Sequence, residues 1–196
     1  MKHYLTFIAT LSFFVSLAQD KSPATLIDGN IRKISGYGSF ITGLQMVKGD
    51  VWNLSGGEGV VILNEKLLIG GYGVGSRHDR RTSDGDYHWE GLSHGGIVLG
   101  YVFNNENMVH LKASTRIGKG TLTFYDDSQV NRAGHSHDNT TVINPQLELE
   151  VNVTHWMRGR LGGGVLLMHG LDNHLYKDHN FIRPNLELAF AFGWFK

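Results

Sequence analysis

Several segments of the chain alternate apolar and polar residues with a period of two, which is the pattern of a β-strand whose two faces meet different surroundings. Over 146–153 the odd positions are apolar and the even positions polar, and over 185–194 the even positions form one large apolar face. The stretch 109–117 alternates in the same way. Beyond residue 35 no apolar repeat at helical spacing is sustained, so the sequence predicts an all-β chain.

The connections between the predicted strands carry a second pattern. Eight strand-like runs can be placed, at 36–47, 51–63, 67–76, 90–103, 108–123, 141–153, 157–169 and 181–195. From the second run onward short and long connections alternate: 64–66, 104–107 and 154–156 are short, and 77–89, 124–140 and 170–180 are long. In an antiparallel up-and-down sheet this places the short turns at one end and three long loops at the other. Only the link over 48–50 is short at the long-loop end.

An even number of strands with short turns at one end and long loops at the other is typical of outer-membrane barrels. The sequence resembles the small eight-stranded outer-membrane barrel proteins of Gram-negative bacteria, the OmpA/OmpX-like group. Its Gly36-Tyr37-Gly38 start and its glycine-rich second and third strands resemble small Bacteroidetes-type barrels of uncharacterised function. The resemblance spans about 36–195 and implies an eight-stranded, antiparallel, up-and-down transmembrane β-barrel in the outer membrane.

The same resemblance implies partners. An outer-membrane barrel is surrounded by outer-membrane lipid and lipopolysaccharide. Barrels of this group close with a C-terminal aromatic residue that the barrel-assembly machinery reads, and here Phe195 is followed by Lys196. Recognition of the C-terminal strand by that machinery is therefore implied, with a slight departure from the usual ending.

The N-terminal segment is predicted to be a targeting signal. A short basic start is followed by an almost wholly apolar stretch over 4–15 and by small residues at Ser16 and Ala18. This order is that of a secretory signal peptide, and the apolar stretch is shorter than the roughly 20 residues of a membrane-spanning helix. We therefore expect a signal peptide over 1–18, a lead-in over 19–35 and a barrel domain over 36–196.

The charged residues of the predicted strands indicate which face points outward. Arg158 and Arg160 follow Glu148 and Glu150 across the three-residue turn over 154–156. An antiparallel hairpin there would place Glu150 opposite Arg160. One step nearer the turn, Asn152 would face Arg158. Since an arginine on the lipid face costs about 2–4 kcal/mol at mid-depth, the charges are expected inside, as a structural plug of a narrow barrel. The expected members of this lumen charge network are Glu148, Glu150, Arg158, Arg160, Glu187, Lys112 and Arg116.

A secreted soluble barrel of the lipocalin kind is the alternative fold, because a soluble barrel simply turns its apolar face inward. In that case the same ion pairs would lie in water, where each contributes about 0–1 kcal/mol. Alternation by itself does not separate the two folds.

Glycine and tryptophan are placed as a small barrel requires. Most of the 26 glycines fall within predicted strands, where they permit the kinks and close backbone approach of a strongly curved wall. The tryptophans fall near predicted strand ends, which is typical of the aromatic girdles at the two membrane interfaces. They are Trp52, Trp89, Trp156 and Trp194.

The predicted long loops hold most of the histidines, together with acidic neighbours. They are His78, His88, His135, His137, His174 and His179, with His169 at a loop edge. Imidazole and carboxylate together suit zinc, copper or nickel. The densest cluster makes His135, His137 and Asp138 candidate metal ligands, against the plainer interpretation that they are solvated loop residues.

The composition excludes several classes of function. Lysine and arginine number 18 and balance 18 acidic residues without a basic stripe, which argues against a nucleic-acid partner. The absence of cysteine excludes a thiolate zinc site and cysteine catalysis. Nothing in the sequence calls for a cofactor.

An enzymatic barrel is a further alternative, since lipid A acylases and deacylases include eight-stranded barrels. The dipeptides Ser93-His94 and Ser136-His137 could supply nucleophile and base, but neighbours on a strand point to opposite faces. We therefore predict a non-enzymatic outer-membrane barrel with a structural role, or with a surface role in adhesion or partner docking through its loops. A lipid-modifying enzyme and a loop-borne metal-binding protein are the alternatives.

Overall fold

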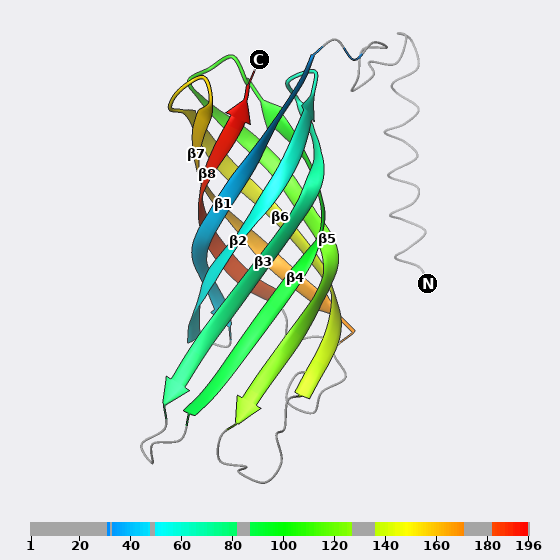
Figure 1. Cartoon of the computed structure of the whole chain (residues 1–196), viewed down its shortest axis with the longest axis vertical. Helices are drawn as coiled ribbons and strands as arrows, with labels where there is room; N and C mark the ends of the chain where they lie inside the picture. The colour runs from blue at the N-terminus through cyan, green and yellow to red at the C-terminus, as the bar shows by residue number, and fades with distance from the viewer. Residues whose placement is uncertain are drawn as a thin grey trace, which may run out of the picture. The chain divides into compact units, whose positions relative to one another are not determined.

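The computed structural model of the chain describes residues 31, 33–47, 50–81, 87–126, 136–170 and 182–195. The strands are β1 (Ile34–Val47), β2 (Asp50–Leu63), β3 (Leu67–Arg81), β4 (Tyr87–Phe103), β5 (Val109–Asp126), β6 (Ser136–Asn152), β7 (Met157–His169) and β8 (Ile182–Trp194). They pair antiparallel in chain order, and β8 pairs with β1, so that the sheet closes into a barrel (Figure 1). The predicted all-β, eight-stranded, up-and-down barrel is confirmed.

The turns that join β2 to β3, β4 to β5 and β6 to β7 lie with the C-terminus at one end of the barrel, here called the short-turn end (Figure 1). The turn between β2 and β3 has positive φ at both Asn64 and Glu65, at 49° and 61°, and Lys66 N–H donates to the carbonyl of Leu63 at 3.1 Å. Two residues with positive φ form the turn whose twist matches that of the strands it joins. The opposite end, where β3, β5 and β7 finish, is the long-connection end.

Four strands extend further toward the long-connection end than the sequence predicts. The observed limits are Arg81 for β3, Tyr87 for β4, Asp126 for β5 and Ser136 for β6. Backbone pairing continues past the end of the apolar alternation, because the main-chain hydrogen bonds of a sheet do not require apolar side chains. His78, His88 and His137 therefore lie in strands, and their assignment to loops is wrong.

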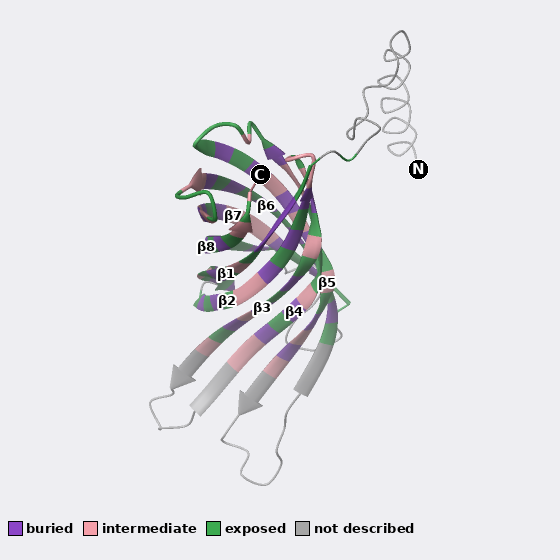
Figure 2. Cartoon of the chain, turned by 45° about the horizontal axis from the view of Figure 1, so that its top comes forward, coloured by how far each residue is buried: buried purple, intermediate pink, exposed green. Residues whose placement is uncertain are grey.

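Burial alternates along the strands (Figure 2). One set of side chains therefore points into the barrel and the other points away from it. The outer set is apolar where the sequence predicts it: Leu147 is 54% exposed and Leu186 is 56% exposed. On β6 every outward residue from Ile143 to Val151 is apolar. We call this ring of outward apolar side chains the outer apolar band. At about 3.4 Å per residue and a usual tilt of 35–45°, it is about 20 Å tall on β6, close to the height of a membrane barrel's apolar belt.

One tryptophan does not fit the predicted outer girdle. Trp156 and Trp194 are exposed at the short-turn end, as predicted. Trp52 is instead only 1% exposed, lies inside the barrel and stacks on the ring of His78 at 6.2 Å between centroids. Its girdle assignment is wrong, because it shares its face of β2 with the buried positions. The side chain of Trp89 lies outside the described residues.

The interior is divided between apolar and charged side chains. The inward face of β1 to β4 is mainly apolar, with Ile41, Leu54 and Val98 among the buried residues. The inward face of β5 to β8 carries most of the buried charges. A separate apolar cluster packs inside the barrel toward the long-connection end, and we call it the apolar layer. It consists of Val47, Trp52, Leu92, Leu122, Val142, Leu166 and Met168.

The strand glycines fall into two groups with different physical roles. At inward positions such as Gly118 and Gly43, a Cβ would collide with the carbonyl oxygen of the neighbouring strand. Only glycine permits that close approach, as predicted for a narrow barrel. At the outward positions Gly38, Gly59 and Gly73, a Cβ would meet nothing within 4 Å. Close packing within the chain therefore does not explain why glycine occupies these outward positions.

This division predicts opposite results for two alanine substitutions. Gly118→Ala should destabilise the barrel by about 1–3 kcal/mol, the usual cost of overpacking. Gly73→Ala should be neutral or should stabilise by about 0.5–1 kcal/mol, since glycine loses more backbone entropy on folding than alanine. Urea unfolding of the refolded barrels measures both. Equal stabilities of the two variants would contradict the division.

Candidate functional site: the charged interior of the barrel

The seven side chains expected in the lumen lie inside the barrel, on four adjacent strands. Lys112 and Arg116 project from β5, two glutamates from β6, two arginines from β7 and one glutamate from β8. All seven are at most 6% exposed. The register places Glu150 opposite Arg160 and Asn152 opposite Arg158, as the predicted hairpin requires.

A glutamate from the opposite wall, Glu58 on β2, lies at the centre of these charges. Its carboxylate accepts hydrogen bonds from Lys112 Nζ at 3.2 Å, from Arg116 Nη2 at 3.1 Å and from Arg160 Nη1. The hydroxyl of Tyr37 also donates to it, at 3.2 Å. Glu58 therefore joins β1, β2, β5 and β7 through the middle of the barrel. We call Glu58 and the seven predicted residues together the central charge network.

The network continues from Glu58 toward the long-connection end through Arg116. One guanidinium nitrogen, Nη1, donates to both oxygens of Glu187 at 3.0 and 2.8 Å, while Nη2 reaches Glu58. Gln146 Nε2 donates to Glu187 at 2.7 Å, and Asn185 donates to the same carboxylate. Arg116 thus connects β2, β5 and β8.

Toward the short-turn end the network passes through Glu150. This carboxylate contacts His110 Nε2 at 2.9 Å and accepts from Arg158 Nη1 at 3.4 Å. Arg158 also donates to Asn105 Oδ1 at 3.1 Å and lies over the ring of Phe195, 4.0 Å from its centroid. The last aromatic residue of the described chain is therefore tied to the interior.

The remaining carboxylate, Glu148, links two of the cations. It accepts from Lys112 Nζ at 3.3 Å and from the hydroxyl of Ser114 at 3.2 Å, and its other ion pair is with Arg160 at 3.2 Å. Four cations thus meet four carboxylates in the central charge network. Buried charges persist only when they are paired and hydrogen-bonded, and each of these eight groups has at least one ion pair. The Nε atoms of the three arginines and Glu150 Oε1 have no hydrogen-bond partner among the described residues.

Sequence reasoning missed three side chains that complete the site, Tyr37, Glu58 and His110. Glu58 shares its face of β2 with Trp52 and Val60, so no polar alternation marks that face as inward. The period-two pattern was informative only on β5, β6 and β8, where one face is polar and the other apolar. On β2 the one sequence feature that could have indicated an interior charge is Glu58, a lone carboxylate among glycines and apolar residues.

The candidate metal ligands fall largely outside the described residues. His135 lies outside them, and for His137 and Asp138 the structure describes the strand backbone but not the side chains. Among the side chains that are described, no group of three or more histidine, aspartate or glutamate residues is placed to hold a metal ion. A metal site at His135, His137 and Asp138 stays a prediction.

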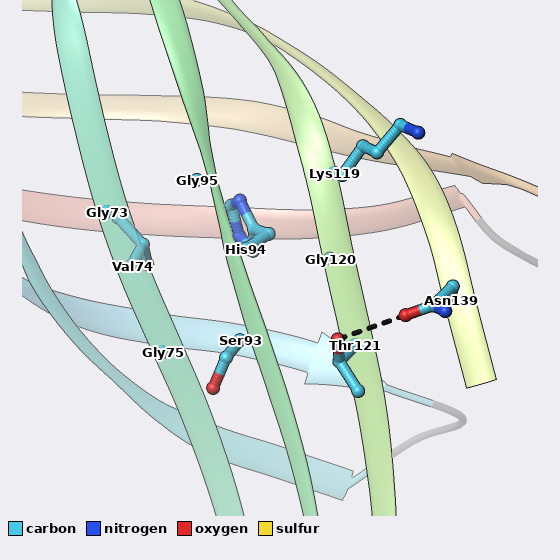
Figure 3. Close-up of a pocket in the computed structure, with 10 residues that line it drawn as sticks. All are labelled: Gly73, Val74, Gly75, Ser93, His94, Gly95, Lys119, Gly120, Thr121 and Asn139. Carbon is cyan, nitrogen blue, oxygen red and sulfur yellow. Dashed lines mark hydrogen bonds between the residues drawn. The ribbon is translucent and has the colours of Figure 1, made fainter. Parts of the chain in front are cut away.

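The proposed nucleophile and base of an enzyme do not meet at Ser93-His94. Ser93 is exposed on the outer face, whereas His94 is 6% exposed (Figure 3). The Nδ1 atom of His94 lies 3.2 Å from the hydroxyl of Tyr72. The two side chains leave the strand on opposite faces, as the geometry of a strand requires. For Ser136-His137 the side chains lie outside the described part of the chain.

Solved structures of small outer-membrane barrels share this architecture. Ail, the attachment invasion locus protein of Yersinia pestis, in complex with the heparin analogue sucrose octasulfate, matches with a TM-score of 0.54 at 13% identity. The match covers 82% of this chain and 98% of Ail. The chain has the fold of the small eight-stranded outer-membrane barrels.

Two further structures support the same assignment of fold. The N-terminal β-barrel domain of Pseudomonas aeruginosa OprF matches with a TM-score of 0.52 at 13% identity, covering 81% of this chain and 99% of that domain. Neisserial surface protein A matches with a TM-score of 0.58 at 8% identity, covering 81% of this chain and 96% of that one. No family model and no curated protein matches the sequence. Within the described ranges no helix is long and apolar enough to cross a membrane.

The central position of Glu58 predicts a large loss of stability when its charge is removed. Glu58→Gln leaves the three surrounding cations one carboxylate short, and breaking a buried ion pair in this way costs about 3–5 kcal/mol. The matched control is Glu65→Gln, because Glu65 pairs with Lys33 at 2.6 Å near the surface, where an ion pair contributes about 0–1 kcal/mol. Urea unfolding midpoints of the two variants test this, and equal midpoints would contradict a central role for Glu58.

Proposed function

We propose that the protein is a non-enzymatic integral outer-membrane barrel that holds its long connections at the cell surface for adhesion or for docking a protein partner. The observation that carries this proposal is the inverted polarity of the barrel. The central charge network buries four carboxylates and four cations inside, whereas large apolar side chains such as Leu147 and Leu186 are exposed outside. That arrangement is stable in lipid, and in water it would expose a wide apolar surface.

The height of the outer apolar band supports a membrane location over the soluble lipocalin-like alternative. About 20 Å of continuous outward apolar surface on β6 is close to the roughly 25 Å belt of membrane barrels. Exposed Trp156 and Trp194 lie at the short-turn end of this band, as interfacial aromatics do. A soluble barrel would instead bury its larger apolar face.

The filled interior supports a structural role for the central charge network, as a plug and not a solute channel. An eight-stranded barrel is just wide enough for its side chains to fill, and here the network joins opposite walls through Glu58. An ion moving along the axis would also have to cross the apolar layer, where Leu92, Leu122, Val142 and Leu166 are completely buried. Both features favour a barrel that acts as a rigid anchor for its connections over one that conducts solutes.

A surface role is favoured over a lipid-modifying enzyme by two observations. The separation of Ser93 and His94 onto opposite faces removes one candidate pair of catalytic residues. Two barrels of similar fold are described as an attachment invasion locus protein and as a surface protein. On such scaffolds the connections that leave the rigid barrel are where binding residues usually lie.

The membrane location predicts that an arginine on the outer band is costly. Leu147→Arg places a charge at the middle of the band on β6 and should destabilise the barrel in phospholipid vesicles by about 2–4 kcal/mol. Glu106→Arg, at an exposed position of a short turn, should have little effect. The measurement is urea unfolding from vesicles. If Leu147→Arg is as stable as the control, the exterior does not face lipid.

The proposed orientation predicts which end of the barrel reacts from outside the cell. The chain has no cysteine, so single-cysteine variants carry one thiol each. On intact cells a membrane-impermeant maleimide should label Ser83→Cys, in the connection over 82–86, and should leave Glu106→Cys unlabelled. After lysis both should react. Labelling of Glu106→Cys on intact cells with protection of Ser83→Cys would overturn the orientation.

A further inference from the structure

The outer wall of the barrel carries a recess of about 660 Å³ on β3 to β6 (Figure 3). Most positions that line it face outward, because they are in phase with the exposed Ile69, Ile97 and Ile117 on the same strands. The volume is in the range of about 300–1,000 Å³ that small-molecule sites occupy. The recess is distinct from the central charge network, which lies inside the barrel.

The floor of the recess is bare backbone at Gly73, Gly75 and Gly95. A Cβ at Gly73 would meet nothing within 4 Å, and one at Gly75 would meet nothing nearer than Ser93 Oγ at 3.8 Å. The barrel's own packing therefore leaves room for a side chain at these two positions. Their glycines instead keep open a space that a molecule outside the chain can enter.

The recess begins at the level where the outer apolar band ends. On β5 the last outward apolar residue is Ile117, and the next outward residue is Lys119. On β6 the outward apolar residue nearest the long-connection end is Ile143, and Asn139 is the second outward residue beyond it in that direction. Since the band matches the hydrocarbon layer, these polar residues lie at the height of the lipid headgroups.

The polar groups around the recess suit an anion. Lys119 is exposed and makes no ion pair with any residue that the structure describes. The hydroxyl of Thr121 donates to Asn139 Oδ1 at 3.3 Å, which leaves the Asn139 amide nitrogen as a donor. Ser93 adds an exposed hydroxyl, and none of the described lining residues is acidic. One cation with several neutral donors matches a singly charged phosphate ester.

We propose that this recess binds the phosphate headgroup of a membrane lipid, with Lys119 paired to the phosphate and an acyl chain lying against the glycine floor. This inference rests on the proposed membrane location. A lipid fits better than free phosphate, because the floor carries no side chains and adjoins the outer apolar band at Ile97 and Ile117, so that an acyl chain can lie along it. An inorganic phosphate ion would make no contact with the glycine floor.

The test is lipid retention by the purified full-length barrel in dodecyl maltoside, measured by native mass spectrometry. Dioleoylphosphatidylglycerol and dioleoylphosphatidylcholine are the two probes, which share acyl chains and differ in headgroup charge. The unaltered protein should retain the phosphatidylglycerol more tightly. Lys119→Gln should weaken that retention about fivefold, equal to about 1 kcal/mol. Gly73→Leu, which fills the recess, should weaken retention of both lipids.

Matched controls come from the same chain. Lys66→Gln removes an exposed lysine at the short-turn end, and Gly38→Leu fills an outward position that is equally open but outside the recess. Both should retain lipid as the unaltered protein does. Each variant is first checked for folding by its heat-modifiable mobility on unboiled gels.

Two results would overturn the proposal. One is equal retention of phosphatidylglycerol by the unaltered protein and by both Lys119→Gln and Gly73→Leu. The other is complete displacement of the lipid by millimolar inorganic phosphate, which would identify an ion site instead of a lipid site. The experiment is done in detergent, so its failure is distinguishable from failure of the surface labelling that tests cellular location.

Discussion

The barrel depends on neutralising charge in its interior. Glu58 reaches from β2 to cations on β5 and β7, and those cations are held in turn by carboxylates on β6 and β8. Each of these side chains would be costly to bury alone, because desolvation of an isolated charge exceeds the gain from any single contact. Together they connect opposite walls of the barrel. Each charge of the network has at least one partner of opposite sign inside the barrel, and the apolar side chains occupy the outer face.

The wall around this interior is shaped by glycine in two ways. At inward positions such as Gly118, the absence of a Cβ lets neighbouring strands approach closely enough for a narrow barrel to close. At outward positions such as Gly73, the absence of a side chain hollows the outer surface. The first role concerns closure of the sheet, and the second gives the outer wall a recess with a polar rim at Lys119. The high glycine content of the chain thus contributes both to closure of the barrel and to the proposed lipid site.

Sequence reasoning succeeded where one face of a strand is polar and the other apolar. On β6 the alternation from Leu147 to Val153 predicted both the strand and its inward glutamates, and the turn that follows predicted the register with β7. It failed on β2, where both faces carry apolar residues and glycine. There it placed Trp52 outside and overlooked Glu58, since the pattern does not distinguish the faces. Beyond the apolar band it ended β3 and β5 too early, because the alternation stops before the backbone pairing does.

The sequence by itself determined the all-β class, the order of the strands, the alternation of short and long connections and the placement of most interior charges. These follow from local patterns, because a strand exposes its periodicity in a few residues and a short turn pairs its neighbours. Only the tertiary structure decided that Glu58 sits among Lys112, Arg116 and Arg160, and that outward glycines on β3 and β4 leave a recess. Both arise from closure of the barrel, which brings together strands that are distant in the chain.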